Sequence, residues 1–139
     1  MNADADAAIF AMVLDTGAQP FAWGTHDCAM LAFDAVQAVT GTDPAPDLRG
    51  AYSTPEEALS LLRSLGGLKG LCDARVGQRI NVEDMKTGDV VLLNRKLCDG
   101  ITSEHGALGV YWRGLIVARA DKGIAYIAPA SVLMAWRAA

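Results

Sequence analysis

Histidine and cysteine are scarce in this sequence, with two and three residues among 139. The cysteines, Cys28, Cys72 and Cys98, are odd in number and widely spaced, which argues against a disulfide framework. No CxxC pair occurs, and His26 with Cys28 lacks a second pair at zinc-finger spacing, so we predict no metal site and no cofactor. Nucleophilic and acid–base chemistry therefore have few candidate side chains.

Positive charge is also in short supply, because 12 basic residues stand against 16 acidic ones and the formal net charge is -4. This balance lacks the basic surface that sequence-independent nucleic-acid binding requires. The amino terminus, MNADADAAIFAMVL, is acidic where a secretory signal is basic, and its apolar stretch is too short for a membrane span. We expect no nucleic-acid partner, no membrane insertion, and synthesis in the cytoplasm without a signal peptide.

A length of 139 residues predicts one domain, residues 1–139, and an apolar content of 52% is enough for a core. The order of the predicted elements indicates the α+β class. Helical spacing predicts a first helix that ends near Gly17, a second from Cys28 to Gly41, and a third from Thr54 to Gly66. After the segment LGGLKGL the helical signal fades. Extended runs at 90–93, 107–112, 115–118 and 124–127 then predict a meander of antiparallel strands, with the helices packed on one face of the sheet.

Cys28 lies in the first turn of the clearest helix, directly after Thr25, His26 and Asp27, any of which can cap that helix. The unpaired N–H groups and the positive end of the helix dipole stabilise a thiolate there, which makes Cys28 a candidate nucleophile. The alternative is that Cys28 is only a small buried hydrophobic residue of the core. A thiolate also needs a base. The two candidate bases are His105 and His26. His105 directly precedes the strand run GALGVYW, whereas the ring of His26 has to fold back to reach the thiol.

The segment PFAWGTHDCAMLAFDAV resembles the nucleophile segment of the NlpC-type cell-wall peptidases, in which an aromatic-x-x-Gly stretch precedes an Asp-Cys pair that opens a helix. GDVVLL and HGALGVYWRGLIVARADKG resemble that family's Gly-Asp strand and the strand pair carrying its histidine and a third polar residue. The resemblance covers residues 20–129. It implies a papain-like fold and a cysteine endopeptidase that cleaves peptidoglycan stem peptides, with Cys28 as nucleophile and His105 as base.

The form FAWGTHDC, together with the AWR near the end of the chain, resembles small domains encoded among phage tail genes. This resemblance implies phage tail proteins as partners and a place in the virion tail.

Two positions depart from the family pattern. Alignment with the family's His-Val-Gly-Ile-Tyr type of strand places Ala107 where the histidine is expected, and His105 lies two residues earlier, about 6.6 Å along the same face. A bulge or a shifted strand start restores the contact. The third polar position falls near Arg119, which cannot accept a hydrogen bond from an imidazole N–H, and Asp121 replaces it only under the same shift.

Two hypotheses follow from this comparison of residues. The first is an active cysteine peptidase that uses Cys28 and His105. The second is a catalytically degenerate papain-like domain that serves as a structural or assembly component of a phage tail. A cytoplasmic small-molecule-binding module is a third reading, without a specific motif. Trp23, Trp112 and Trp136 are expected in the core, with stacking on a sugar or peptide in a cleft as the alternative. Trp136, beside Arg137, has the further alternative of facing a partner subunit.

Overall fold

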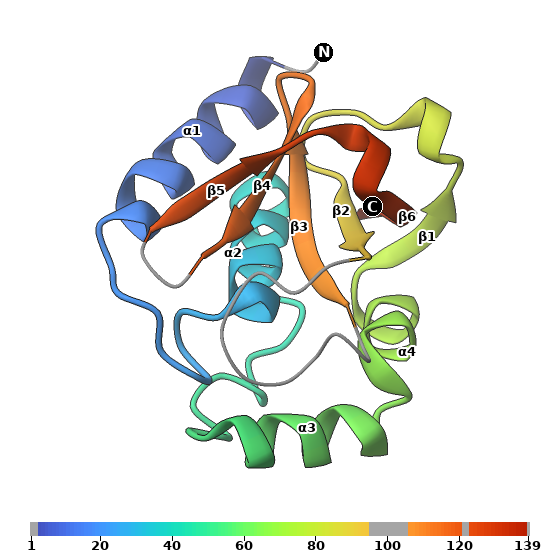
Figure 1. The fold of residues 1–139 in the computed structure, drawn as a ribbon. Coiled ribbons are helices and arrows are strands. Elements are labelled where there is room, and N and C mark those ends of the chain that lie inside the picture. The colour runs from blue at the N-terminus through green and yellow to red at the C-terminus, as the bar shows by residue number, and fades with distance from the viewer. Residues whose placement is uncertain (1–2, 95–105, 121–122, 139) are drawn as a thin grey trace.

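The computed structural model describes residues 3–94, 106–120 and 123–138, and these form an α+β structure, the predicted class (Figure 1). The helices are α1 (Ala3–Gly17), α2 (Cys28–Thr40), α3 (Pro55–Ser64) and α4 (Gly67–Arg75). The strands are β1 (Gly77–Ile80), β2 (Val90–Leu93), β3 (Ala107–Trp112), β4 (Leu115–Arg119), β5 (Ile124–Ile127) and β6 (Val132–Ala138). Two short 3-10 helices cover Val82–Asp84 and Pro129–Ser131.

The strands of the described chain form one antiparallel sheet in the order β1-β6-β2-β3-β4-β5. The predicted meander is confirmed, because β2, β3, β4 and β5 pair antiparallel in sequence order. β6 returns across the sheet and lies between β1 and β2, where Ala135 faces Val91. The sequence patterns missed β1 and β6, because neither alternates polar and apolar side chains as a half-buried strand does.

Helix α4 was not predicted: it begins within the segment LGGLKGL and continues beyond it, where the helical signal was expected to fade. Its sequence GLKGLCDAR contains Gly67 and Gly70, and glycine lowers helix propensity by about 1 kcal/mol per residue relative to alanine. The helix nevertheless forms, and it buries Leu68, Leu71 and Cys72 in the main core cluster. Tertiary burial of these three side chains therefore outweighs a weak local preference.

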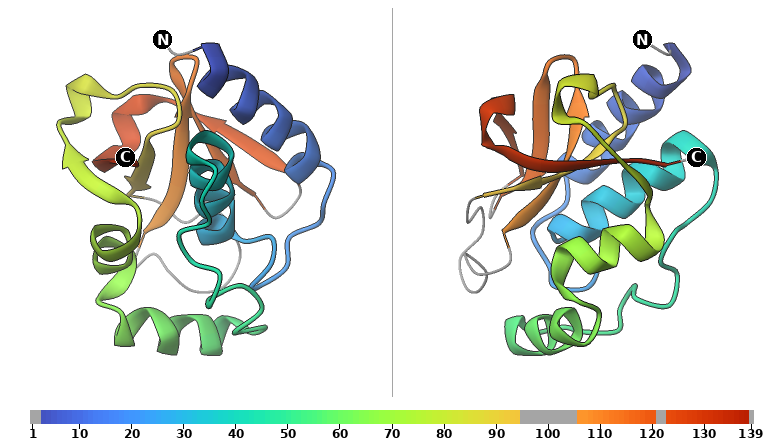
Figure 2. Two further views of the ribbon diagram at one scale, coloured as in Figure 1. Left: turned by 180° about the vertical axis from the view of Figure 1, so that it is seen from behind. Right: turned by 90° about the vertical axis from the view of Figure 1, so that its right-hand side faces the viewer.

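Helices α1 and α2 pack side by side, and α2 lies against β3, as the view from behind also shows (Figure 2). One cluster joins Met30 and Phe33 of α2 to Leu108 of β3. A second cluster joins Ile9 of α1 to Val110 of β3. The helical spacing of Val39 with Ala35 and Val36 predicts an inward-facing side chain, but Val39, in the last turn of α2, is exposed.

The opposite face of the sheet is also buried. In β2, Val90 and Leu92 face the helices, whereas Val91 and Leu93 point to the other face of the sheet. On that face, Val91 and Leu93 form a third apolar cluster with Ile116. This explains why β2 reads as a continuous apolar run. In the described ranges, no helix combines the length and apolar character that a membrane crossing needs.

Trp112 and Trp136 are core residues, as expected. Trp136 is fully buried, and its indole Nε1 donates a hydrogen bond of 2.9 Å to Asp73. The alternative in which Trp136 faces a partner subunit is therefore wrong, because β6 lies inside the sheet and turns this side chain toward α4. Trp23 is only half-buried and belongs to the site described next.

Candidate functional site

Cys28 is the first residue of α2, where the sequence placed it, and its thiol is half-buried. The helix begins there because Asp27 caps it. The Asp27 carboxylate accepts a hydrogen bond of 2.9 Å from the N–H of Met30, the usual geometry of an N-cap aspartate. Gly41, in the left-handed conformation with φ 83°, ends the helix. Local sequence thus sets both ends of the element that carries the thiol.

The Asp27 carboxylate also holds the surrounding chain together. It accepts hydrogen bonds from the N–H of Gly24 at 2.9 Å and from the hydroxyl of Tyr52 at 2.5 Å, and it is only 2% exposed. A buried carboxylate is tolerated when donors satisfy its oxygens, as they do here. Asp27 therefore acts as the structural anchor of the segment in front of Cys28.

Tyr52 remains a hydrogen-bond donor at neutral pH. Burial raises the pKa of its phenol, and the negative charge of Asp27 raises that pKa further. Its backbone makes a second contact with the same segment. Gly24 has φ +84°, and a Cβ atom there would come within 2.1 Å of the carbonyl oxygen of Tyr52. Only glycine permits so close an approach, so the segment before α2 lies directly against residues 50–52.

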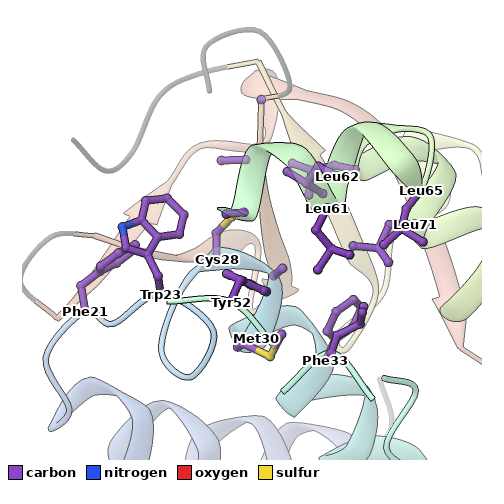
Figure 3. A pocket seen from close by; sticks show the side chains of 16 residues that line it. Phe21, Trp23, Cys28, Met30, Phe33, Tyr52, Leu61, Leu62, Leu65 and Leu71 are labelled. Carbon is purple, nitrogen blue, oxygen red and sulfur yellow. The ribbon is translucent and has the colours of Figure 1, made fainter. Parts of the chain in front are cut away.

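An apolar pocket opens beside Cys28 (Figure 3). Phe21 and Trp23, in edge-to-face contact with ring centroids 4.9 Å apart, lie on one side of the thiol in this view, and Leu61 and Leu62 of α3 lie on the other. The cavity volume is about 50 Å³. The described lining residues carry no charge and are Phe21, Trp23, Cys28, Ala29, Met30, Phe33, Leu48, Tyr52, Ala58, Leu61, Leu62, Leu65, Leu68, Leu71, Gly106 and Ala107.

The start of β3 reaches the same pocket. Gly106 and Ala107 line it together with Cys28, although they lie almost 80 residues away in the chain. The methyl group of Ala107 thus occupies the pocket wall at the position that the resemblance assigns to a histidine. His105, the predicted base, lies outside the described residues, as do Cys98 and Asp121.

His26 is not among the described lining residues of the pocket. Its backbone N–H donates to the carbonyl oxygen of Ala22 at 2.8 Å, which closes the tight loop before α2, and its ring Nδ1 is buried without a hydrogen-bond partner. The imidazole acts electrostatically on Asp34, whose carboxylate pairs with Arg49 at 2.7 Å. The described residues thus place no imidazole on the pocket wall.

Arg119 is fully buried and belongs to a different part of the molecule. Its Nη1 donates to the carbonyl oxygen of Thr16 at 2.6 Å, and its Nη2 donates to the carbonyl oxygen of Gln19. Thr16 lies in the last turn of α1 and Gln19 lies two residues beyond the end of that helix, where backbone carbonyl oxygens accept from donors outside the helix. Arg119 therefore anchors α1 to β4 and does not line the pocket of Cys28.

The family model described as Domain of unknown function (DUF6950) matches residues 2–138. The chain belongs to this family. No curated protein matches the sequence. The DUF6950 description names no activity, so the chemistry of the site has to be argued from its residues. Among the described residues, no group of three or more histidine, cysteine, aspartate or glutamate side chains could hold a metal ion.

Sequence reasoning missed two parts of this DUF6950 site. Tyr52 lies in the proline-containing segment TDPAPDLRGAYS, and its contact with Asp27, 25 residues earlier, has no local pattern. The helical spacing of Leu61 and Leu62 with Ala58 predicts that they face inward, and they do, but toward a pocket beside Cys28. Tyr52 is an isolated aromatic residue in a polar segment, and this is a signal that could have indicated it.

Proposed function

We propose that the chain is a papain-like domain of the NlpC type, a cysteine endopeptidase that cleaves peptidoglycan stem peptides as part of a phage tail. The observation that supports this proposal is the position of Cys28. Cys28 is the first residue of a capped helix, and its thiol is half-buried. The residue lies on the wall of a pocket that the start of β3 also lines. A nucleophilic cysteine is commonly prepared at a helix amino terminus.

In this reaction the Cys28 thiolate attacks the carbonyl carbon of a stem-peptide amide. Backbone N–H groups near Cys28 stabilise the oxyanion, the base protonates the departing amine, and a thioester to Cys28 remains. Water, deprotonated by the same base, then hydrolyses the thioester and restores the thiol. His105 is the base, and it directly precedes Gly106, a lining residue of the pocket.

A second candidate is a catalytically degenerate domain that serves as a structural or assembly component of a phage tail. Two observations favour it. Ala107 presents a methyl group to the pocket at the position where the resemblance expects a histidine. Arg119, near the expected third polar position, is engaged with the backbone carbonyls of Thr16 and Gln19.

Digestion of purified peptidoglycan separates the two candidates. The wild-type chain and the His26→Ala variant are expected to release stem-peptide fragments at similar rates. The Cys28→Ala and His105→Ala variants are expected to lose at least ~100-fold, the usual contribution of a nucleophile or a general base. Chromatography with mass spectrometry of the soluble fragments measures the release. Equal, background-level release from the wild type and Cys28→Ala contradicts the peptidase and favours the structural component.

A further inference from the structure

The pocket beside Cys28 restricts the chemistry of the group that can bind there. We propose that it holds a small aliphatic side chain or acyl group, attached to the carbonyl carbon that Cys28 attacks. This inference rests on the proposed function, because it names the class of substrate for the same thiol.

The first argument is charge. The described lining residues include no acidic, basic or histidine side chain. The hydroxyl of Tyr52, one of the few polar groups on the wall, already donates to Asp27 at 2.5 Å. Along the described part of the wall, a carboxylate or ammonium group would lose its hydration without finding a charged partner, which is strongly unfavourable. An acidic or basic side chain is therefore disfavoured against these described residues, whereas an aliphatic one gains from burial.

The second argument is size. The cavity volume of about 50 Å³ is a third of the roughly 150 Å³ that holds a benzene molecule in an apolar protein cavity. It suits a group of a few carbon atoms and excludes a sugar ring. The third argument is position. Cys28 lies between Trp23 on one side and Leu61 on the other (Figure 3), so a group joined to its sulfur extends along apolar walls.

Labelling with methanethiosulfonates tests the pocket without requiring catalysis. The Cys28 thiolate attacks the sulfenyl sulfur of the reagent, a disulfide forms, and methanesulfinate leaves with the bonding electron pair. The reagents are methyl, butyl and sulfonatoethyl methanethiosulfonate. Peptide mass spectrometry assigns the label to Cys28 rather than to Cys72 or Cys98. The rates are divided by those of the same reagents with free cysteine.

On this normalised scale, butyl is expected to exceed methyl by roughly tenfold, since each buried CH₂ contributes up to about fourfold. Sulfonatoethyl is expected to fall below methyl by a similar factor. Ala58→Leu fills the pocket and is expected to remove the butyl preference, whereas Leu62→Ala enlarges it and extends the preference to a hexyl reagent. Leu133→Ala, at an exposed residue of β6, is the matched control and keeps the wild-type ratios. Circular dichroism checks that each variant is folded.

Normalised rates that are equal for butyl and sulfonatoethyl in the folded wild-type chain overturn the proposal. So does a butyl preference that neither pocket variant changes. A chain with this preference that cleaves no peptidoglycan loses the proposed peptidase activity but retains an aliphatic pocket. A chain that cleaves peptidoglycan through Cys28 but shows no preference loses only the assignment of the pocket.

Discussion

Asp27 is the residue on which the position of Cys28 depends most directly. Its carboxylate joins three parts of the chain: the loop at Gly24, the first turn of α2 at Met30, and the distant Tyr52. A buried charge of this kind is stable only while its donors are present, because an unsatisfied lone pair in the interior costs about as much as a lost hydrogen bond. The donors are therefore as important as the carboxylate itself.

Tyr52→Phe removes one of these donors and little else. We expect the free energy of unfolding to fall by about 1–3 kcal/mol, because a buried carboxylate loses a hydrogen bond from a neutral hydroxyl. Urea unfolding followed by tryptophan fluorescence measures this change. Tyr126→Phe is the matched control, because Tyr126 is 54% exposed, and we expect it to stay within about 0.5 kcal/mol of wild type. Equal stability of the two variants would contradict the anchoring role of Tyr52.

At the scale of elements, α2 lies between two glycines with nearly the same positive φ but different surroundings. Gly24, before the helix, has φ +84° and approaches the backbone of Tyr52, where an added Cβ would lie 2.1 Å from an oxygen. Gly41, after the helix, has φ +83° and open space around it. The first glycine is thus required by packing and conformation, and the second by conformation alone.

Substitution of both glycines by alanine separates these two causes. Gly41→Ala is expected to cost about 1–2 kcal/mol, the price of a left-handed conformation for a residue with a Cβ. Gly24→Ala bears the same strain and must also push the segment before α2 away from Tyr52, so its loss of stability is expected to be clearly larger. The urea midpoints of the two variants provide the measurement. Equal midpoints would show that the contact with Tyr52 relaxes without cost.

At the scale of the whole molecule, ion pairs join different parts of the chain. Asp6 of α1 pairs with Arg113 at 2.9 Å, and Asp73 of α4 pairs with Arg79 of β1 at 2.6 Å. Arg113 holds the pKa of Asp6 below its ordinary value, and Arg79 together with Trp136 does the same for Asp73. Asp34 is the opposite case, because burial raises its pKa despite the neighbouring Arg49.

These shifts predict that the chain loses stability in acid. A carboxyl whose pKa is lower in the folded state contributes stability above its unfolded-state pKa, and the contribution disappears as the pH falls. The lowered groups include Asp6, Asp43, Asp47, Glu57 and Asp73. Asp34 opposes them, since its effect weakens the fold as the pH rises. We therefore expect the urea midpoint to decline between about pH 5 and pH 3.

Asp73→Asn tests whether protonation of Asp73 contributes to the fall of the urea midpoint in acid, because the variant has no carboxyl to protonate at that position. Its urea midpoint is expected to be lower than that of wild type at pH 7 and to change less between pH 5 and pH 3. Gln78→Ala, at an exposed neutral residue of β1, is the control and is expected to keep the wild-type slope. A slope in Asp73→Asn equal to that of wild type would remove Asp73 from the explanation.

Several features of this protein could be predicted from short stretches of sequence. The start of α2 at Cys28, its end at Gly41 and the strand order from β2 to β5 depend on caps, glycines and turns within a few residues. The capping role of Asp27 was among the predicted possibilities. By contrast, α4, β1 and β6 were missed, because the glycines of α4 weaken its local signal and neither strand alternates regularly between polar and apolar residues.

The local sequence was sufficient to place a thiol at the amino terminus of a helix in an α+β protein, because capping and hydrophobic periodicity act over three or four residues. The surroundings of that thiol required the folded chain. The hydrogen bond from Tyr52 to Asp27, the wall of leucines from α3, and the approach of Ala107 join segments 25 to about 80 residues apart. Only packing brings such segments together, since the loop-closure entropy between them is offset by burial that no short window of sequence contains.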